Sequence, residues 1–264
     1  MTPRLRVTTV DAGPFTMPRG GLLHGGGDEP VTVPSTVAVI EHATHGLLLF
    51  DTGINHRVAD PEAAEAHWGP GLRTAYGAGG FTRAHAVDAQ LERLGYRLDE
   101  VRYVLYSHLH LDHAGGMTYF PHAVHVAQHD ELRHAWWPDR WTARGYAFND
   151  YAATRAYDFL ELRGDADLFQ DGTVTLVRTA GHTPGHQGVV LDLPHYGRIG
   201  LMGDAAHLQE GLDRNVPMLS DWNVEEKLLS HGRLRALSRA GIRVSLSHDP
   251  AHFAALPHDG TYWD

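Results

Sequence analysis

The chain has 264 residues, of which 42% are hydrophobic and 20% charged, a balance typical of a soluble globular protein that can bury a substantial core. Its 22 Lys and Arg residues against 32 Asp and Glu residues give a formal net charge of −10, which argues against nucleic acid or an anionic membrane surface as the main partner. Cysteine is absent, so disulfides, thiolate metal sites and cysteine nucleophiles are all excluded.

The beginning of the chain and its hydropathy predict a cytoplasmic protein. Residues 1–6 lead directly into a strand-like run and show no long apolar core or small-residue cleavage site of a secretion signal. No stretch approaches the roughly 20 consecutive apolar residues that a membrane-spanning helix needs. We therefore expect a small-molecule substrate and no membrane partner. The oligomeric state is left open, a homodimer included.

The N-terminal part alternates strand-like runs with a loop rich in Gly and Pro. Runs of β-branched and aliphatic residues predict an edge strand and then a hairpin, at 5–10, 36–41 and 46–50. The segment 11–34 is interpreted as a loop, and the His-Gly-Gly-Gly fragment 24–27 as part of that flexible loop, because no Gly-x-Ser-x-Gly motif accompanies it. The apolar residues Met17, Leu22 and Leu23 form either a substrate-facing lip or packing beneath this loop.

Helical patterns come next, and they lead to a buried strand. Residues 54–68 are partly helical, and residues 69–81 form a glycine-rich loop. Residues 84–94 carry apolar side chains at helical spacing, and Gly95 ends that helix. The apolar run 101–106 then predicts a buried strand.

The stretch 107–116 directly follows this strand and holds four candidate metal ligands within six residues, namely His108, His110, Asp112 and His113. In an extended segment alternate residues share a face, so the first three would converge. His113 needs a turn, which Gly115 and Gly116 supply. Imidazole and carboxylate ligands suit zinc and similar divalent ions, and four close ligands divided by a turn favour two adjacent ions. The alternative is a surface cluster in a chain that holds 21 histidines.

An aromatic-rich segment follows a predicted strand at 123–127 and a helix that begins at 129–135. Aromatic side chains are concentrated between residues 136 and 163, where strand character is weak. We interpret residues 130–163 as a helical insertion that lies over the site. The alternative is a satellite core packed against a sheet.

The second half of the chain places further candidate ligands beside predicted strands. These strands are expected at 173–178, 188–193, 199–202 and 244–249. His182 and His186 follow the first of these strands, and Asp204 follows the third. His248 lies in the last strand. A helix at 224–240 precedes the last strand, and its predicted apolar face consists of Leu228, Leu229, Leu234 and Leu237.

This order of elements predicts an α/β fold. Strands, a helix and strands are followed by strands, a helix and a strand, which fits two mixed β-sheets back to back with helices on the outer faces, an αβ/βα sandwich. No linker divides the chain. Residues 1–264 are therefore expected to form a single domain that carries the insertion near 130–163.

The ligand pattern resembles that of the metallo-β-lactamase superfamily, over a span from about Asp51 to His248. The matching positions are His108-x-His110-x-Asp112-His113, then His182 in a Gly-His-Thr-Pro-Gly-His context, then Asp204 and His248. The resemblance implies the fold of that superfamily and two divalent ions, first of all Zn²⁺, although the same ligands accept Fe, Mn and Co. It implies one ion on His108, His110 and His182. The other ion would lie on Asp112, His113 and His248, with Asp204 as a bridge.

Within the superfamily, the length, the long N-terminal loop and the aromatic insertion are most similar to the quorum-quenching N-acyl-homoserine lactonases. This resemblance implies a metal-dependent hydrolase that opens a lactone ring. Those lactonases usually carry a tyrosine three residues after the bridging aspartate, where its hydroxyl polarises the lactone carbonyl. Here that position is His207. Its ring either donates a hydrogen bond from a similar place or belongs to an exposed loop.

The expected mechanism follows from the chemistry of the ions. Two divalent ions about 3.5–4 Å apart lower the pKa of a bridging water toward about 7, so the expected nucleophile is a metal-bridging hydroxide. Asp112 is expected to bind an ion and also to carry the nucleophile's proton to the leaving alkoxide. Asp51 and His186 either orient the ligand histidines by hydrogen bonds or are turn residues satisfied by their own backbone.

Other functions remain open at this point. The same metal core serves thioesterases, phosphodiesterases, phosphotriesterases and β-lactamases. Thioesterases like glyoxalase II add a C-terminal helical domain, whereas only 16 residues follow His248, and a secreted β-lactamase needs an export signal. A non-catalytic metal-binding protein is a further alternative, which the complete set of ligands disfavours.

Overall fold

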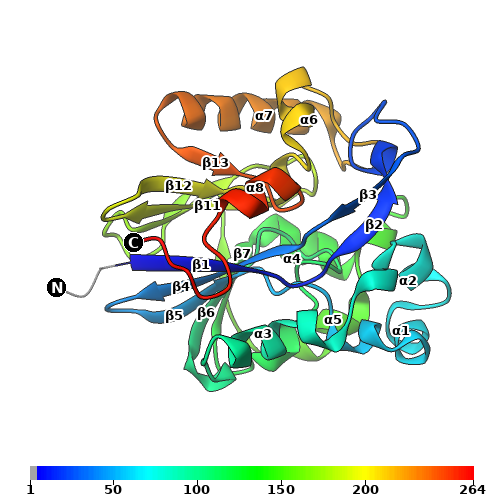
Figure 1. Cartoon of the computed structure of the whole chain (residues 1–264), viewed down its shortest axis with the longest axis horizontal. Coiled ribbons are helices and arrows are strands. Elements are labelled where there is room, and N and C mark those ends of the chain that lie inside the picture. The colour runs from blue at the N-terminus through cyan, green and yellow to red at the C-terminus, as the bar shows by residue number, and fades with distance from the viewer. Residues whose placement is uncertain (1–4) are drawn as a thin grey trace.

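Two mixed β-sheets lie face to face in the computed structural model, which describes residues 5–264 (Figure 1). The strands of the first sheet are, in order, β1 (Leu5–Asp11), β4 (Thr36–His42), β5 (Gly46–Phe50), β6 (Val101–Leu105), β7 (Val124–Gln128) and β8 (Asp158–Leu162). Those of the second are β13 (Arg243–Ser245), β12 (Gly197–Leu201), β11 (Gln187–Leu193), β10 (Val174–Arg178) and β9 (Ala166–Asp167). The strands from β5 to β8 pair in parallel, as do β12 and β13, and the remaining pairs are antiparallel.

One hydrophobic core fills the space between the sheets. Ile40, Leu48 and Leu105 of the first sheet pack in the same buried cluster as Leu176 and Leu191 of the second. Burial of one such side chain contributes about 1.5–3 kcal/mol to the free energy of unfolding. The shared core supports the proposal that the chain forms a single domain.

Helices cover the outer faces of both sheets (Figure 1). The helices packed on the first sheet are α3 (Val87–Arg93), α4 (His129–Trp136) and α5 (Phe148–Tyr151), with α1 (Pro61–Trp68) and α2 (Leu72–Ala75) beside them. The second sheet is covered by α6 (Gln209–Arg214) and α7 (Val224–Arg239), and α8 (Pro250–Ala255) follows β13. The predicted αβ/βα sandwich is therefore confirmed.

Short 3-10 helices complete the connections. They are η1 (Arg19–Gly21), η2 (His56–Ala59), η3 (Ala78–Gly80), η4 (Arg83–His85), η5 (Leu98–Glu100), η6 (Met117–Tyr119), η7 (Ala143–Gly145), η8 (Ala152–Thr154) and η9 (Gly203–Ala205). The segment 54–68 is helical in η2 and α1, as predicted, whereas the expected loop 69–81 also contains α2 and η3. The last predicted strand is shorter than expected, because β13 ends at Ser245 and residues 246–249 turn away from the sheet.

The segment 11–34, expected as a loop, contains a small antiparallel sheet of β2 (Phe15–Pro18) and β3 (Pro30–Val33). Pro18 and Pro30 face each other at one end of this pair. Proline is tolerated at strand ends, where no ladder hydrogen bond is lost. The loop prediction was wrong because the residues that usually mark loops lie here at the ends of short strands.

The apolar residues of this segment were expected either to face the substrate or to pack beneath the loop, and the structure shows both arrangements. Leu23 is 1% exposed and packs in a small core beneath the segment. Met17 and Leu22 line the cavity described below. The fragment 24–27 lies outside the strands, in the connection between β2 and β3.

The aromatic segment 130–163 is helical only in part. It contains α4, η7, α5 and η8, but residues 158–162 form β8, which pairs with β7 at the edge of the first sheet. Asp158 and Glu161 interrupt the apolar residues of β8, as is common in an edge strand, so no clear strand pattern was visible. Tyr146 and Tyr151 are buried in the core on this side of the sheet, whereas Trp141 lines the cavity.

The buried face of α7 differs from the predicted apolar face. Leu229 is 64% exposed, so its prediction was wrong. The buried side chains of the helix are Lys227, Ser230, His231 and Leu234. Counting apolar residues fails here because the helix presents mostly polar side chains to the interior, where the structure supplies partners for Lys227.

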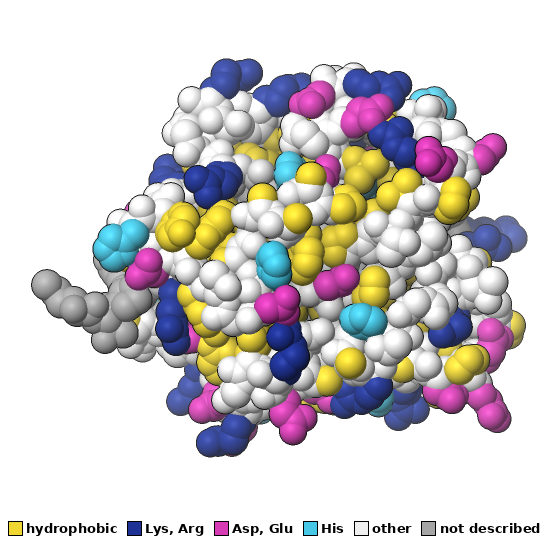
Figure 2. All heavy atoms as spheres, in the orientation of Figure 1, with side chains coloured by type: hydrophobic (Ala, Val, Ile, Leu, Met, Phe, Trp, Pro, Cys, Tyr) yellow, Lys and Arg dark blue, Asp and Glu magenta, His cyan; other side chains and the backbone are white. Residues whose placement is uncertain are grey.

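The start of β1, where the described residues begin, and the C-terminal end lie on the same side of the molecule (Figure 1). Residues 1–4, part of the segment expected to lack an export signal, lie outside the described residues. Within residues 5–264, no helix combines the length and apolar character needed to cross a membrane. On the face drawn in Figure 2, acidic and basic side chains are interspersed rather than separated.

Candidate metal centre and catalytic cavity

The candidate ligands follow strands whose carboxyl ends meet at one edge of the sandwich. β5 and β6 run parallel, so Asp51 and the stretch 107–116 leave their sheet on the same side. β12 and β13 also run parallel, and Asp204 and His248 follow them. The loop 179–186 follows β10. The fold thus brings together residues from both halves of the chain.

The argument from alternation assumed that the stretch 107–116 is extended. In the structure it is not. The main-chain oxygen of His110 accepts hydrogen bonds from the N–H groups of His113 and Ala114, at 3.0 and 2.9 Å. These bonds make a tight turn. The turn divides the four candidate ligands into two pairs that enter different clusters.

Gly115 and Gly116 were expected to supply this turn, and they serve close packing instead. Neither adopts the left-handed backbone conformation that favours glycine. A Cβ atom on Gly115 would lie 2.2 Å from the main-chain nitrogen of Asn55. On Gly116 it would lie 2.5 Å from Cγ1 of Val87. The expectation was wrong because the turn needs no special backbone angle, whereas the neighbouring chain leaves no room for a side chain.

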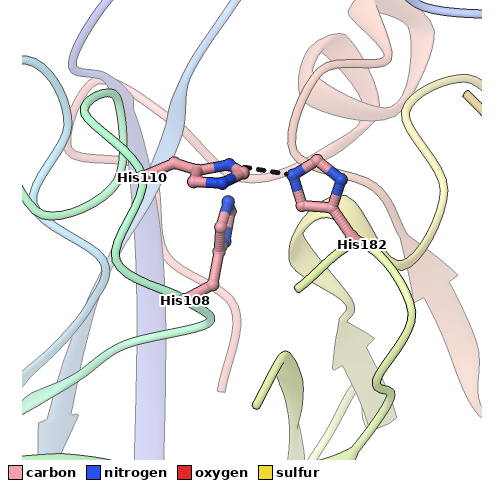
Figure 3. Close-up of side chains that lie close together, drawn as sticks. All are labelled: His108, His110 and His182. Carbon is pink, nitrogen blue, oxygen red and sulfur yellow. Dashed lines mark hydrogen bonds between the residues drawn. The ribbon is translucent and has the colours of Figure 1, made fainter. Parts of the chain in front are cut away.

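Three histidines form the first cluster of potential metal ligands. His108, His110 and His182 place their ligand nitrogens within 4.8 Å of one another. Figure 3 shows the three rings converging from two separate loops, with Nε2 of His182 3.0 Å from Nδ1 of His110. Imidazole nitrogens directed at a common point are typical ligands of a zinc-like ion.

Asp112, His113 and His248 form the second cluster. Oδ2 of Asp112 lies 3.3 Å from Nε2 of each histidine. The two Nε2 atoms are also 3.3 Å apart. All three side chains are buried. One carboxylate and two imidazoles therefore face a second common point.

The carboxylate of Asp204 lies between the two clusters. Its Oδ1 is 3.2 Å from Nε2 of His248 and 3.4 Å from Nε2 of His113. Its Oδ2 is 3.4 Å from Nε2 of His182, on the other side. Asp204 thus offers one oxygen to each cluster, which is the arrangement needed to bridge two cations.

Hydrogen bonds to groups outside the two clusters orient the clustered histidines. Nδ1 of His113 lies 2.8 Å from Oδ2 of Asp51, so the predicted contact of Asp51 with a candidate ligand is confirmed. Ser107 fixes this carboxylate by its N–H and hydroxyl, each at 2.7 Å, which stabilises the left-handed backbone of Asp51 (φ 66°). Nδ1 of His248 donates a 2.6 Å hydrogen bond to the main-chain oxygen of Pro34.

His186 was expected either to orient a ligand histidine or to be a turn residue satisfied by its own backbone, and its ring instead contacts the main chain of Asp204 and Thr179. Its Nε2 accepts a 2.9 Å hydrogen bond from the main-chain N–H of Asp204. Its Nδ1 faces Thr179, 3.1 Å from the main-chain oxygen. The ring therefore fixes the main chain of Asp204. Nδ1 of His182 lies 2.9 Å from Oδ1 of Asp221, so the loop directs the two rings to different partners.

The clusters leave buried atoms that protein groups do not satisfy. Among the described residues, Nε2 of His108, Oδ2 of Asp112 and Oδ1 of Asp204 are buried without a hydrogen-bond partner. Burial lowers the pKa of His108 well below its usual value, so the ring is neutral. Burial opposes ionisation of Asp112 and Asp204, but neighbouring imidazoles hold both pKa values well below the usual range. The neutral ring of His108 and the ionised carboxylates of Asp112 and Asp204 suit divalent cations, so these residues fit metal ions.

Comparison with known proteins agrees with this geometry. A family model described as the Metallo-beta-lactamase superfamily matches residues 30–252. The chain belongs to this superfamily. The resemblance inferred from the ligand motif is therefore confirmed, together with the fold.

The similar proteins include several lactonases. N-acyl homoserine lactonase AttM of Rhizobium johnstonii is 33% identical over 90% of this chain and 89% of its own. AttM of Azorhizobium caulinodans is 35% identical over 67% of this chain and 68% of its own. A solved N-acyl homoserine lactone hydrolase, with the product N-hexanoyl-L-homoserine bound at its catalytic metal centre, has a TM-score of 0.83. That match covers 99% of this chain and 100% of the other, at 22% identity.

A cavity of about 770 Å³ opens onto both clusters of candidate metal ligands. Its polar base is formed by His110, Asp112, His182, Asp204, His207 and His248. Its apolar wall is formed by Phe15, Met17, Leu22, Trp68, Leu72 and Met218. A volume of this size is typical of small-molecule sites, which range from about 300 to 1,000 Å³.

His207 lies in the base of this cavity, so the alternative of an exposed loop residue was wrong. The side chain is 6% exposed, and its Nε2 lies 3.0 Å from Oδ2 of Asp204. Its ligand nitrogen also lies within 4.8 Å of those of His182 and Asp204. Burial lowers the pKa of His207 to about 4, although Asp204 opposes this, and the neutral ring keeps one N–H donor.

Sequence reasoning missed Glu131, which joins the two loops that carry the first cluster. Its carboxylate accepts hydrogen bonds from the N–H of Leu109 at 2.9 Å and of Gly185 at 3.2 Å. It also accepts from the hydroxyls of Tyr146 at 3.1 Å and Thr183 at 2.6 Å. The sequence offers little signal for this role, because an acidic residue in the first turn of a helix is ordinary.

Sequence reasoning also missed a buried ion pair behind His182. Nδ1 of His182 lies 2.9 Å from Oδ1 of Asp221, and Nζ of Lys227 lies 3.0 Å from the same oxygen. Lys227 lowers the pKa of Asp221, against the effect of burial. The sequence marks this position, because Lys227 is the only lysine of the chain.

Proposed function

We propose that this protein is a metal-dependent hydrolase that opens lactone rings, with N-acyl-homoserine lactones as the substrate class. The observation that carries the proposal is the cavity, which has a base of metal-ligand side chains and an apolar wall. Such a cavity suits a polar lactone ring that bears an apolar acyl chain. The lactonases among the relatives support the same assignment.

We propose that two divalent ions bind at the base of the cavity. One would be held by His108, His110 and His182, the other by Asp112, His113 and His248, and Asp204 would contact both. Zn²⁺ is proposed because it favours imidazole and carboxylate ligands in tetrahedral sites, although Fe, Mn and Co accept the same ligands. When bound, the ions would supply a water of lowered pKa and a Lewis acid for the carbonyl oxygen.

The side chains of the cavity base perform the remaining steps of the proposal. Asp112 is ionised, so it can accept the proton of the attacking water. It then returns that proton to the ring oxygen as the carbon–oxygen bond breaks. With Asp204 engaged by the ions, the single N–H of His207 would be released from this carboxylate and would donate to the carbonyl oxygen of the substrate, where negative charge develops.

An activity panel on one metal-loaded preparation tests the assignment. The panel contains acyl-homoserine lactones of several chain lengths, a thioester, a phosphotriester, a phosphodiester and a β-lactam. We expect the highest kcat/KM on a lactone. A higher value for another class would replace the lactonase assignment by that activity. Bound metal with no turnover on any compound would indicate a non-catalytic protein.

Metal analysis tests the proposed centre separately. Seven nitrogen and oxygen ligands exceed what one tetrahedral ion uses, so we expect about two ions per chain. The measurement is metal content by mass spectrometry after saturation and removal of free metal. At most one ion per chain at saturation would reject the two-ion centre.

A further inference from the structure

Tyr76 faces the cavity base and has no role in the mechanism given above. It directly follows α2 and lines the cavity. Its hydroxyl is hydrogen-bonded to the side chain of Asp112, and the charge of Asp204 also acts on it. A phenol has an ordinary pKa of about 10, so the hydroxyl is protonated at neutral pH and can donate.

The surrounding structure fixes the ring of Tyr76 firmly. The ring of Phe15 lies 4.9 Å from that of Tyr76 and 5.0 Å from that of His248, so it spans the two. Gly77 has a left-handed φ of 77°, and its main-chain oxygen accepts a 2.9 Å hydrogen bond from the N–H of Thr16. A Cβ atom on Gly77 would lie 1.8 Å from the main-chain oxygen of Thr16. Close packing against β2 therefore sets the direction of the tyrosine beside it.

Tyr76 and His207 lie beside different carboxylates of the cavity base. Nε2 of His207 is 3.0 Å from Oδ2 of Asp204, whereas the hydroxyl of Tyr76 is hydrogen-bonded to the side chain of Asp112. Asp112 is the side chain to which the proposed mechanism gives the proton. A donor held against this carboxylate restricts its rotation, and a restricted group transfers a proton more efficiently than a mobile one.

We propose that Tyr76 is a positioning residue that holds Asp112 in place for proton delivery to the leaving oxygen. The inference rests on the proposed lactonase function. In the reaction, the oxygen of water bonds to the carbonyl carbon and a proton passes from that water to Asp112. The ring carbon–oxygen bond then breaks, its electron pair stays on the ring oxygen, and this oxygen takes the proton from Asp112. Atoms and charge balance to a ring-opened hydroxy acid.

The test compares Tyr76→Phe with the parent on two lactones. One is an alkyl lactone, whose leaving alkoxide must be protonated. The other is an aryl lactone, whose phenolate leaves without prior protonation near neutral pH because a phenol has a pKa of about 10. We expect Tyr76→Phe to lower kcat on the alkyl lactone by about tenfold or more, since one hydrogen bond to a charged group is lost. The KM, the bound metal and kcat on the aryl lactone should change little.

Tyr96→Phe is the matched control, because Tyr96 also donates its hydroxyl to a carboxylate, that of Glu41, but does not line the cavity. It should leave both lactone activities unchanged. Equal losses of kcat on the two lactones in Tyr76→Phe, or no loss at all, would overturn the positioning role. Reduced metal content would also overturn it and make Tyr76 part of the metal site. A parent enzyme without activity on either lactone would instead reject the proposed function, and this inference with it.

Discussion

The ammonium group of Lys227 donates a 2.6 Å hydrogen bond to the main-chain oxygen of Asp204, in the interior of the protein. Lys227 is 1% exposed, and its second partner is the carboxylate of Asp221, 3.0 Å away. The only lysine of the chain thus supports two residues of the metal centre, Asp204 directly and His182 through Asp221. This contact joins α7 to the cavity base.

Lys227→Met should therefore destabilise the protein. The substitution leaves the charge of Asp221 buried without its partner, which costs about 3–5 kcal/mol in comparable ion pairs. We expect the free energy of unfolding, measured by urea denaturation of the metal-saturated protein, to fall by about 3 kcal/mol. Arg239→Met, at the exposed end of α7, is the control and should have little effect. A change below about 1 kcal/mol in Lys227→Met would mean that the pair contributes no net stability.

Glu131→Gln should weaken both stability and metal binding. The carboxylate accepts four hydrogen bonds from the two loops of the first cluster, whereas an amide places its own N–H groups against some of these donors. We expect a loss of about 2–3 kcal/mol in the free energy of unfolding, as for hydrogen bonds to charged groups. Metal loss during chelator competition should also be faster. The exposed Glu92→Gln on α3 is the control, and equal behaviour of the two variants would contradict the role of Glu131.

Asp204→Ala and Asp112→Asn should separate metal binding from proton transfer. Asp204 faces both clusters, so its removal should abolish activity together with most bound metal. Asp112→Asn keeps a ligand oxygen but cannot take a proton, so it should retain part of the metal while kcat falls by about 10²–10⁴-fold. Metal content and kcat are measured on the same preparations. Normal turnover of Asp112→Asn would show that another group carries the proton.

His207→Ala tests the residue that stands in place of the usual lactonase tyrosine. If His207 donates to the substrate carbonyl, kcat should fall between about tenfold and a few hundredfold, which is the effect of losing one oxyanion donor or somewhat less. Bound metal should change little. His207→Tyr should retain substantial lactonase activity, because the tyrosine hydroxyl is also a donor. Equal activity of the parent and both variants on every lactone tested would make His207 a bystander.

Short-range patterns in the sequence predicted most of the fold and the candidate ligands. The spacing of His108, His110, Asp112 and His113 after an apolar run is local information, and so are the β-branched residues of the central strands. The small sheet of β2 and β3 was missed because its strands are short and each has a proline at one end. The role of His186 stayed open because its partner, the N–H of Asp204, comes from another strand end.

The supporting residues of the site depend on contacts between distant segments, which no local pattern encodes. Glu131 receives its hydrogen bonds from residues near positions 109, 146 and 184, and each of these segments has an ordinary composition on its own. Tyr76 lies in a segment that was expected to be a glycine-rich loop. Its direction becomes defined only where Gly77 packs against Thr16. Among the supporting residues, only Lys227 is marked in the sequence, because it is the single lysine in a chain whose other basic residues of this kind are arginines. The structure places it in the interior.

The last prediction concerns acid stability and the buried ring of His125. Its Nε2 donates a 2.9 Å hydrogen bond to the main-chain oxygen of Phe120, and its Nδ1 accepts one of 2.9 Å from the hydroxyl of Tyr106. This arrangement requires the neutral ring, and burial lowers the pKa of His125 to about 4. The unfolded chain, with an ordinary pKa of about 6.5, takes up a proton over this interval that the folded protein does not.

The contribution of His125 to stability should therefore be complete above about pH 6.5 and should be lost as the pH falls toward 4. With about 1.4 kcal/mol for each pKa unit, the loss amounts to about 3 kcal/mol across this window. His125→Gln does not titrate, so it should be less stable than the parent near neutral pH but lose less free energy of unfolding on acidification. Urea denaturation of both proteins without metal, at several pH values between about 4 and 7, measures the difference while excluding metal release. Parallel pH curves for parent and variant would show that another group, and not His125, controls acid stability.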